Sequence, residues 1–428
     1  MTQGYPLHRR QLLGAGAAIA LTTLAGCAGP GTPSARGRVV VVGGGFGGAT
    51  AAHYLKLWGG DGVEVTLVER QAEFVSCPIS NLVLGGFQTM AAITHRYDGL
   101  RALGVNVLQA QVLAIDATAR SVQLADRRAL AYDRLVLSPG IDFMTDQIGG
   151  LQAALERGQV FHAWKAGPQT AGLRRQLEAM PDGGVFAMFI PKSPYRCPPG
   201  PYERACVVAS YLKANKPRAK VLVCDANAEI TSKKGLFEAA FRQLYAGIIE
   251  YRPNAELKEL AGGVARTDFD DIKADVLNPI PPQRGGDLAR VAGLLNVNAR
   301  WAGVHWLTLE STAAPGIHVL GDTTFSAPGM PKSGHMANQQ AKVAAAAILQ
   351  LLAGQPVNPA PVVANTCYSF VSPTEAVHVA SVHQFDPAEK TFKPVPGAGG
   401  VSAAINQIEA RQAMGWAQNI WADTLALA

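Results

Sequence analysis

Short apolar runs alternate with amphipathic stretches at the start of the chain, and the same order returns further along. The runs Val39–Val42 and Val63–Val68 are typical of buried parallel strands, with a helix predicted between them over residues 47–57. Strands are predicted again over residues 184–190 and 220–225, on either side of a second helix. The pattern therefore predicts an α/β protein with two doubly wound, Rossmann-like dinucleotide-binding domains.

The turn after the first strand follows the G-x-G-x-x-G pattern and opens a helix, which is the context that this motif requires. The residues of the turn that we expect to bind a dinucleotide are Gly43, Gly45, Phe46, Gly47 and Gly48. Glycines let the backbone approach a pyrophosphate, and the helix N-terminus attracts its charge. Glu69, at the end of the second strand, can accept hydrogen bonds from a ribose, and we include Arg70 beside it. The alternative is a glycine-rich turn in an unrelated α/β protein.

Two later strands favour FAD over NAD as the dinucleotide. Residues 132–140 form a strand that ends in the tight turn Pro139-Gly140, and residues 316–322 form a strand that ends in Gly-Asp322. Both look like the later FAD motifs of flavoproteins with two dinucleotide-binding domains. In that family the aspartate binds the ribityl chain, so the resemblance implies this role for Asp322. A lone Gly-Asp is usually only a turn, but this one lies between a strand and a predicted helix.

The second unit lacks the glycines of the first. Its first strand leads into a proline-rich loop over residues 191–201. Prolines have no backbone N–H to donate, and side chains at these positions would block close approach of a phosphate. We therefore expect no pyridine nucleotide site and an electron donor other than NAD(P)H. The stiff loop instead presents Cys197.

These motifs set the expected domain boundaries. An FAD-binding domain takes two segments, 36–150 and 285–360, on either side of the second Rossmann-like domain over residues 151–284. Short β-prone stretches toward the C-terminus predict a small α+β domain with an antiparallel sheet, taken as 361–428, that faces the flavin or forms an interface. Residues 1–35 are expected to be a signal peptide and a flexible lead.

The N-terminal residues are typical of an export signal. Arg9 and Arg10 precede the apolar run Ala15–Leu24, which is shorter than the roughly 20 residues that span a bilayer. Paired arginines indicate the twin-arginine route, which carries folded proteins, so we expect a periplasmic location. Cys27 follows Leu-Ala-Gly as in a lipoprotein processing site. Either a lipid anchor there or simple cleavage a few residues later fits the pattern.

Composition is that of a soluble globular protein. The chain has 428 residues, 48% hydrophobic and 16% charged, and a net charge of +6, which falls to +4 if the two leader arginines are lost. This charge is too mild and too scattered to favour nucleic acid. No cysteines have zinc-type spacing, and His162, His305 and His335 have no metal-ligand spacing. We therefore expect neither a nucleic-acid partner nor a metal site.

The chain has six cysteines, which in an exported protein favours a disulfide. Without Cys27 five remain, so at least one sulfur is free or otherwise bonded. Cys206 and Cys224 lie in an apolar helix and an apolar strand, which is typical of small buried hydrophobes. Cys197 follows Arg196 and precedes a predicted helix start. Positive neighbours and a helix N-terminus favour a thiolate at Cys197.

Cys77 lies eight residues after Glu69, on a loop that can reach the ring system of a dinucleotide. At this point the chain resembles the flavoprotein subunit of flavocytochrome c sulfide dehydrogenase, in the pyridine nucleotide-disulfide oxidoreductase superfamily with its glutathione-reductase-like fold. The resemblance implies FAD joined through its 8α-methyl group to Cys77. It also implies a redox-active disulfide between Cys197 and Cys367, above the isoalloxazine ring. The segments that carry it are Val39–Ala52, Glu64–Gly86, His162–Gly167, Arg196–Arg204, Ile280–Arg284, Pro331–Gly334 and Asn365–Ser369.

The resemblance makes Cys197 and Cys367 the candidate catalytic residues of sulfide oxidation. Hydrosulfide would leave its sulfur on Cys197, and a thiolate would form at Cys367, nearer the flavin. A purely structural bridge, worth ~4–5 kcal/mol in the chain-entropy model, is the alternative. Glu203, in the first turn of the following helix, could relay protons or interact only with the helix N-terminus. Lys332 could place positive charge near the flavin pyrimidine edge, or be a solvated loop lysine.

The chain has no C-x-x-C-H motif, so it cannot attach a c-type haem itself, and a separate c-type cytochrome subunit is the expected acceptor. We therefore predict an exported FAD oxidoreductase that converts sulfide to sulfane sulfur or polysulfide. A sulfide:quinone oxidoreductase shares the fold and the two-cysteine chemistry but needs an apolar surface for the membrane. Residues 416–421 are polar enough to indicate a packed helix or a subunit contact instead. A flavoprotein accessory of a sulfur-carrier system for thiosulfate oxidation is a further alternative, and the proline-rich loop disfavours an NAD(P)H-dependent disulfide reductase.

Overall fold

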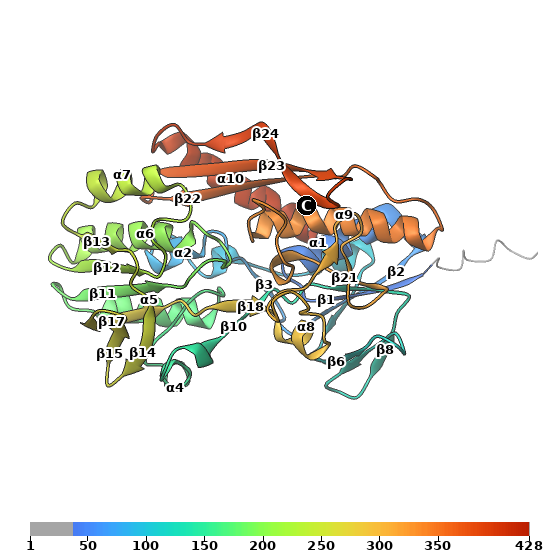
Figure 1. The fold of residues 1–428 in the computed structure, drawn as a ribbon, viewed down its shortest axis with the longest axis horizontal. Helices are drawn as coiled ribbons and strands as arrows, with labels where there is room; N and C mark the ends of the chain where they lie inside the picture. The colour runs from blue at the N-terminus through green and yellow to red at the C-terminus, as the bar shows by residue number, and fades with distance from the viewer. Residues whose placement is uncertain (1–36, 428) are drawn as a thin grey trace, which may run out of the picture. The chain divides into compact units, whose positions relative to one another are not determined.

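A seven-stranded sheet forms the first part of the fold in the computed structural model, which describes residues 37–427 (Figure 1). Its order is β19-β20-β21-β9-β1-β2-β5, and β1 pairs in parallel with β2 and with β9. The strands are β1 (Arg38–Val42), β2 (Glu64–Glu69), β5 (Asn106–Gln109), β9 (Arg134–Leu137), β19 (Val304–His305), β20 (Glu310–Ser311) and β21 (Ile317–Val319). Residues Val39–Val42 are buried because β1 is central and covered on both faces. The segments predicted to form the FAD-binding domain, 36–150 and 285–360, thus contribute strands to one sheet.

Helices cover this sheet and short hairpins extend it. Helix α1 (Phe46–Gly59) packs against α9 (Gly334–Leu352) over the sheet. The smaller elements of this region are η1 (Gly60–Gly62), β3 (Phe74–Val75), α2 (Ser80–Leu84), η2 (Ala91–Ile93), β4 (Thr94–His95), α3 (Asp98–Leu103), β6 (Val112–Asp116), β7 (Ser121–Leu124), β8 (Ala129–Ala131), β10 (Ile141–Phe143), η3 (Thr145–Gln147), β18 (Gln283–Gly285), α8 (Asp287–Val291) and η4 (Gly321–Thr323).

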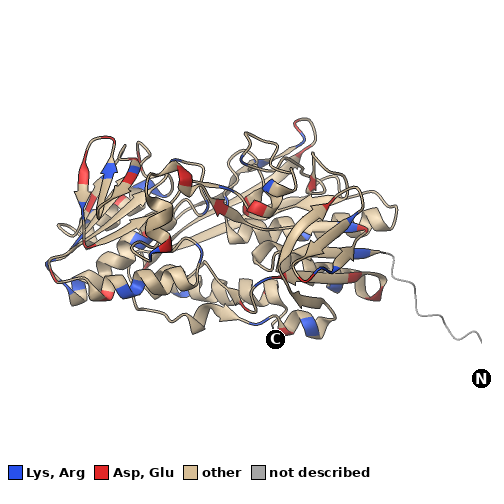
Figure 2. Ribbon diagram, turned by 90° about the horizontal axis from the view of Figure 1, so that it is seen from below, with Lys and Arg blue, Asp and Glu red and all other residues tan. Residues whose placement is uncertain are grey.

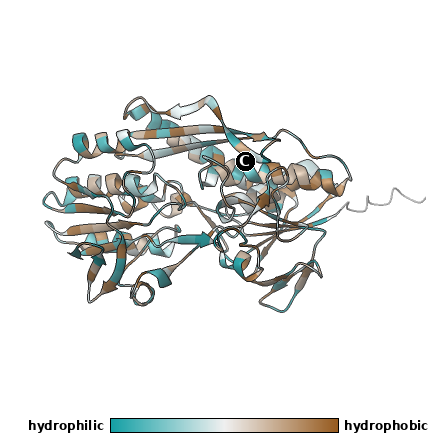
Figure 3. Cartoon of the chain, in the orientation of Figure 1, coloured by the Kyte–Doolittle hydropathy of each residue, from teal (hydrophilic) through white to brown (hydrophobic). Residues whose placement is uncertain are grey.

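A second sheet has four parallel strands in the order β13-β12-β11-β17. These strands are β11 (Val185–Ile190), β12 (Lys220–Asp225), β13 (Ile249–Arg252) and β17 (Val276–Pro279). The helices of this region are α4 (Leu151–Glu156), α5 (Pro168–Ala179), α6 (Gly200–Asn215) and α7 (Lys234–Leu244), and a small antiparallel sheet holds β14 (Leu257–Ala261), β15 (Val264–Thr267) and β16 (Asp271–Lys273). The parallel strands of both sheets carry buried apolar residues (Figure 3).

The C-terminal residues form an antiparallel sheet and a helix, drawn in red in Figure 1. The sheet consists of β22 (Val362–Phe370), β23 (Ala376–Asp386) and β24 (Thr391–Val401), and the helix is α10 (Gln407–Leu425). Helix α10 packs against α1, and its Trp421 side chain is buried and donates a hydrogen bond to Ser76 Oγ at 2.9 Å. The interpretation of residues 416–421 as part of a packed helix is therefore confirmed.

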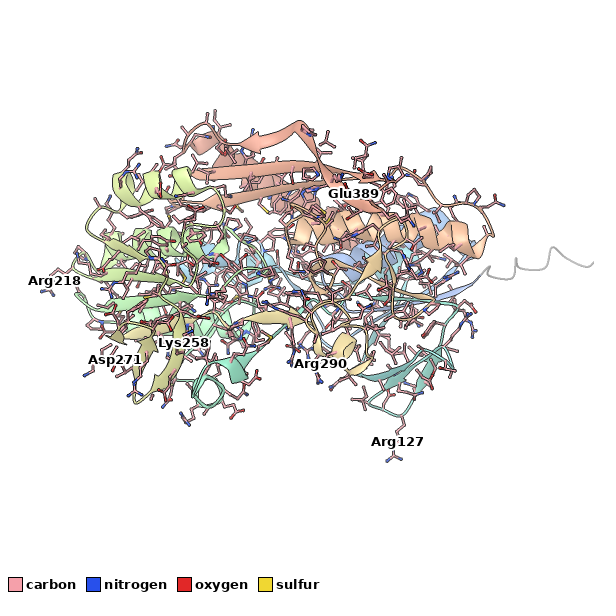
Figure 4. The ribbon with its side chains drawn as sticks, in the orientation of Figure 1. Arg127, Arg218, Lys258, Asp271, Arg290 and Glu389 are labelled. Carbon is pink, nitrogen blue, oxygen red and sulfur yellow. The ribbon has the colours of Figure 1, made fainter. Side chains whose placement is uncertain are left out.

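The predicted fold class is confirmed, since a sheet whose central strands are parallel and a second, fully parallel sheet, both with helices, precede a small α+β unit. The predicted helix over residues 47–57 and the strands Val63–Val68 and 184–190 differ from the observed elements by at most two residues at either end, because the ends of elements are set by capping and tertiary contacts. Charged residues of both signs are interspersed over the described chain (Figure 2). Among them, Arg127, Arg218, Lys258, Asp271, Arg290 and Glu389 extend outward from the ribbon (Figure 4).

The predictions for Arg9, Arg10 and Cys27 lie outside the described residues. Within residues 37–427, each helix is too short or too polar to pass through a bilayer.

Candidate functional site

One cavity collects side chains from segments that lie far apart in the sequence. Its walls come from the glycine turn before α1, the loop after β2, the loop before α6, the end of β21, the start of α9, the middle of β22 and one face of α10. About 1350 Å³ of space lies between its atoms, open solvent included. The predicted site residues that line it are Gly45, Phe46, Gly47, Cys77, Gly140, Cys197, Glu203, Asp322 and Cys367.

The glycine turn leaves room for a ligand at one position and is tightly packed at two others. A Cβ at Gly43, where φ is +98°, would lie 2.3 Å from the carbonyl oxygen of Ser138, and one at Gly48 would lie 1.8 Å from the carbonyl oxygen of Gly43. A Cβ at Gly45 would meet no atom within 4 Å. Gly43 and Gly48 are therefore required for the turn itself, whereas Gly45 leaves open space on the cavity side.

The predicted ribose-binding residues differ in their surroundings. Glu69 accepts a hydrogen bond from the backbone N–H of Gly44 at 2.6 Å, so its carboxylate is held against the glycine turn. Arg70 is exposed and does not line the cavity. Pro139 lies beside Gly286, and Gly140 accepts a hydrogen bond from Thr323 Oγ1 at 2.6 Å.

The surroundings of Asp322 indicate whether this wall of the cavity can bind the ribityl chain of FAD. Its Oδ1 is buried and has no hydrogen-bond partner among the described residues, while its Oδ2 lies 4.0 Å from Arg196 Nε. Burial raises the pKa of Asp322, although Arg196 and Lys332 oppose this. A buried acceptor without a donor is costly unless a ligand supplies one. The residues therefore fit a hydroxylated chain lying along this wall of the cavity.

Cys77 has a cationic partner. Arg196 Nη2 donates to the Cys77 sulfur at 3.5 Å, and the same nitrogen donates to the carbonyl oxygen of Trp164. Burial opposes the thiolate, but the charge and the hydrogen bond of Arg196 outweigh it, so the pKa of Cys77 is lowered below its ordinary value of 9.0. Cys77 is therefore the thiol that its surroundings activate as a nucleophile.

Cys197 and Cys367 line the same cavity, and the structure has both as free thiols. The predicted thiolate at Cys197 is wrong. Burial raises the pKa of Cys197, the negative charges of Cys367 and Glu203 add to this, and Arg196 lowers it by less. The backbone of Cys197 has a φ of +58°, which is strained for a residue other than glycine. The disulfide between the two sulfurs stays a prediction.

The remaining cysteines lie outside the cavity. Cys206 on α6 and Cys224 on β12 are fully buried in apolar clusters, so the interpretation of both as small core residues is confirmed. Burial raises the pKa of each thiol. Neither sulfur is poised for chemistry.

Glu203 faces the two thiols from the first turn of α6. Its carboxylate accepts hydrogen bonds from the backbone N–H of Phe370 at 3.0 Å and from Asn81 Nδ2 at 3.0 Å. Burial raises the pKa of Glu203 above its ordinary value of 4.5, against the effect of these donors. The side chain is therefore able to hold a proton beside Cys197 and Cys367.

Lys332 lies behind the cavity wall. Its ammonium donates to the carbonyl oxygen of Asp322 at 3.1 Å and to that of Thr324, and it lies 3.8 Å from the centroid of the Trp301 ring. It is buried, so the alternative of a solvated loop lysine is wrong. Burial lowers the pKa of Lys332 to about 7. In this position the side chain stabilises the turn that carries Asp322, and a charge near the flavin stays a prediction.

Two buried cations of the site were missed by sequence reasoning. Arg204 on α6 is fully buried and donates four hydrogen bonds, to the side chains of Asn81 and Asn278 and to the carbonyl oxygens of residues 162 and 163. Its signal is an arginine directly before the apolar run Ala205–Ala209 of the helix. Lys233 donates to the carbonyl oxygen of Cys367 at 3.0 Å. No local pattern in the sequence marks Lys233.

Within residues 37–427, no three His, Cys, Asp or Glu side chains gather in a way that could hold a metal ion.

Three family models match successive parts of the chain. "Pyridine nucleotide-disulphide oxidoreductase" matches residues 37–170, "Sulfide dehydrogenase [flavocytochrome c] flavoprotein chain, central" matches residues 170–281, and "Flavocytochrome c sulphide dehydrogenase, flavin-binding" matches residues 359–425. The matches cover strands β1, β2, β5 and β9 of the first sheet, the second sheet and the C-terminal unit, whereas residues 282–358, with β19, β20, β21 and α9, lie outside them.

Several curated proteins are similar in sequence. A sulfide dehydrogenase [flavocytochrome c] flavoprotein chain of Chlorobaculum thiosulfatiphilum is 59% identical over 46 residues, which is 11% of this chain and 94% of that sequence. The mitochondrial sulfide:quinone oxidoreductase of Dictyostelium discoideum is 21% identical over 297 residues, 67% of this chain. The chain spans 65% of the length of that second protein.

Many solved structures share the fold. The sulfide:quinone oxidoreductase of Aquifex aeolicus has a TM-score of 0.75 at 18% identity, covering 90% of this chain and 91% of the other. A covalent putidaredoxin reductase–putidaredoxin complex gives 0.66 at 20% identity, covering 90% and 94%. At these identities the likeness extends to the fold alone.

Proposed function

The chain belongs to the family of flavocytochrome c sulfide dehydrogenase flavoprotein chains, and from this premise we propose that it oxidises sulfide to sulfane sulfur or polysulfide and passes the electrons to a c-type cytochrome subunit. One observation supports this above the others. Cys77, Cys197 and Cys367 come from three distant segments and line one cavity together with Asp322 and the glycine turn. Two sulfurs beside a flavin site are what sulfide oxidation through a disulfide requires.

The cysteines and Glu203 supply the sulfur chemistry. Hydrosulfide attacks the Cys197 sulfur of the disulfide, a new S–S bond forms there, and the bond to Cys367 breaks with its electron pair going to the Cys367 sulfur. The sulfur of the substrate is oxidised and the disulfide is reduced. Glu203, whose pKa is raised by burial, takes or returns the proton of the attacking group. FAD, when bound, accepts electron pairs and releases them singly.

In this proposal Cys77 would hold FAD through a thioether to its 8α carbon. That bond would replace an 8α C–H bond, whose proton is released, and the two electrons left on the flavin would pass to the cytochrome acceptor. Such a bond requires a nucleophilic thiolate, and Arg196 at 3.5 Å supplies the charge that stabilises one. Asp322, with its unpartnered Oδ1, is the ribityl partner. The thioether would keep FAD from dissociating.

The electron donor is not a pyridine nucleotide in this proposal. The loop between β11 and α6 carries prolines where a phosphate would need backbone N–H groups. Arg196, Cys197 and Pro199 of this loop line the cavity instead. The paired arginines Arg9 and Arg10 support export to the periplasm, where a cytochrome partner would be met.

Anaerobic titration with sulfide, followed by flavin absorbance, tests the proposal. We expect sulfide to bleach the flavin of the wild-type protein and of Cys224→Ser, whose sulfur lies outside the cavity, but not that of Cys197→Ser or Cys367→Ser. Reoxidation by ferricytochrome c is expected to be faster than by a short-chain quinone. Unimpaired bleaching in Cys197→Ser, or bleaching by NADH and not by sulfide, would overturn the proposal. Activity only with an added sulfur-carrier protein would favour the accessory role instead.

A further inference from the structure

Lys233 is a buried lysine that contacts the strand of Cys367. It precedes α7, and its side chain passes behind β22, where Nζ donates to the carbonyl oxygen of Cys367 at 3.0 Å and to Ser369 Oγ at 2.8 Å. The residue is 8% exposed. Its neighbour Lys234 is exposed and paired with Glu229 at 2.6 Å. Two adjacent lysines therefore have opposite surroundings.

The ammonium of Lys233 has no carboxylate within 4.0 Å in the part of the chain that the structure describes. A buried charge without a counter-charge is costly, so a nearby group that becomes negative is strongly favoured. Burial lowers the pKa of Lys233, whereas Cys367, Glu203, Cys197 and Glu409 on α10 raise it, in that order of effect. Cys367 is thus the negative group to which this ammonium is most strongly coupled.

Other groups face Cys367 from the elements packed against β22. Burial raises the pKa of Cys367, Lys233 lowers it, and Glu203 on α6 raises it by less. Cys197 faces the same cavity, and His335 on α9 lies beside it with Nδ1 accepting from the backbone of Thr366. Lys233 also acts on Glu203, but its coupling to Cys367 is stronger, so Lys233 is the cation best placed to balance a thiolate at Cys367.

We propose that Lys233 is a positioning residue that stabilises the thiolate of Cys367, and thereby makes Cys367 the leaving sulfur and Cys197 the sulfur that is attacked. This step rests on the proposed function, because it concerns the same disulfide. When hydrosulfide bonds to Cys197, the electron pair of the broken S–S bond passes to Cys367 beside the ammonium. A leaving thiol with a lower pKa leaves faster, so Lys233 sets the direction of attack.

The pH dependence of thiol alkylation tests this without turnover. The reduced holoenzyme is treated with iodoacetamide over a pH series, and the modified peptides are separated and quantified by mass spectrometry. Lys233→Met should raise the midpoint for Cys367 by a pH unit or more, so that alkylation below the midpoint is about tenfold slower. Lys234→Met should match the wild type, and Lys233→Arg should restore most of the reactivity. An unchanged Cys367 profile in folded Lys233→Met would overturn the proposal.

The wild-type protein supplies a second measurement in case Lys233→Met does not fold. In the wild type, Cys367 should be alkylated at lower pH than Cys197, and the reverse order would overturn the proposal. Failure of the proposed function would be recognised separately, since sulfide would then leave the flavin oxidised whatever the order of alkylation.

Discussion

The partnership between Arg196 and Cys77 gives a prediction with a calculable size. Two unit charges 3.5 Å apart interact by about 5 kcal/mol at an effective dielectric constant near 20. Burial of the sulfur offsets part of this, and the net result is a pKa of Cys77 below its ordinary value of 9.0. In Arg196→Gln the burial remains and the charge is lost. We therefore expect the pKa of Cys77 to rise by at least one unit, which is about 1.4 kcal/mol and a tenfold loss of thiolate at any pH below both pKa values.

Two measurements follow this change. Iodoacetamide should alkylate Cys77 about tenfold more slowly in Arg196→Gln than in the wild type, when both are purified without flavin and mapped by mass spectrometry. The intact mass after denaturation should also show slower acquisition of covalent FAD on reconstitution, with Cys77→Ser as the chain that acquires none. Arg196→Lys keeps the charge but not the planar fork, so it should lie between the two. Wild-type rates in a stably folded Arg196→Gln would refute the reasoning.

Two further changes test buried polar groups. Burial raises the pKa of Glu203, so the folded chain holds this proton more tightly than the unfolded chain. This stabilising effect is complete at pH values below the ordinary pKa of 4.5 and is lost as the pH rises through the raised pKa of the folded chain. The free energy of unfolding of the wild type should therefore fall with rising pH relative to that of Glu203→Gln. The slope is at most about 1.4 kcal/mol per pH unit. Urea midpoints over a pH series measure this, and a constant difference would contradict it. Arg204→Met should destabilise the fold by about 3–5 kcal/mol, because it leaves buried acceptors of four hydrogen bonds without a donor. Denaturant unfolding against the exposed control Arg175→Met checks it, and a loss below about 1 kcal/mol would contradict it.

Local patterns were sufficient to predict much of the fold. The run Val39–Val42 could be assigned to a central strand because a segment buried on both faces is apolar throughout. The antiparallel strands β19 and β20, which extend the first sheet, could not be predicted in the same way. Each has only two residues and pairs with a segment chosen by the tertiary structure. Pairing between distant segments has no local signal.

The residues that form the site could be predicted from the sequence better than the charges on their side chains. Glycines, Cys77 and Asp322 follow the ends of predicted parallel strands, and such ends meet at one edge of a sheet. The charge on each sulfur depends instead on the direction of individual side chains. Arg196 is adjacent to Cys197 in sequence, yet its guanidinium turns to Cys77, 119 residues away.

The positions of the two cations provide the physical reason why three thiols in one cavity need not react alike. Burial alone would raise the pKa of all three, so a sulfur becomes nucleophilic only where a fixed positive charge offsets the loss of water. Arg196 does this at Cys77, and Lys233, which is 134 residues from Cys367, lies where it can do so at that sulfur. The pKa values of Cys197 and Cys367 both stay above the ordinary value. At Cys197 the charges of Cys367 and Glu203 add to burial and outweigh Arg196 and Lys233, whereas at Cys367 the largest influence after burial is Lys233, so Cys197 suits the role of the sulfur that is attacked. Sequence adjacency cannot reveal such a division, because each pairing joins segments that only the fold brings together.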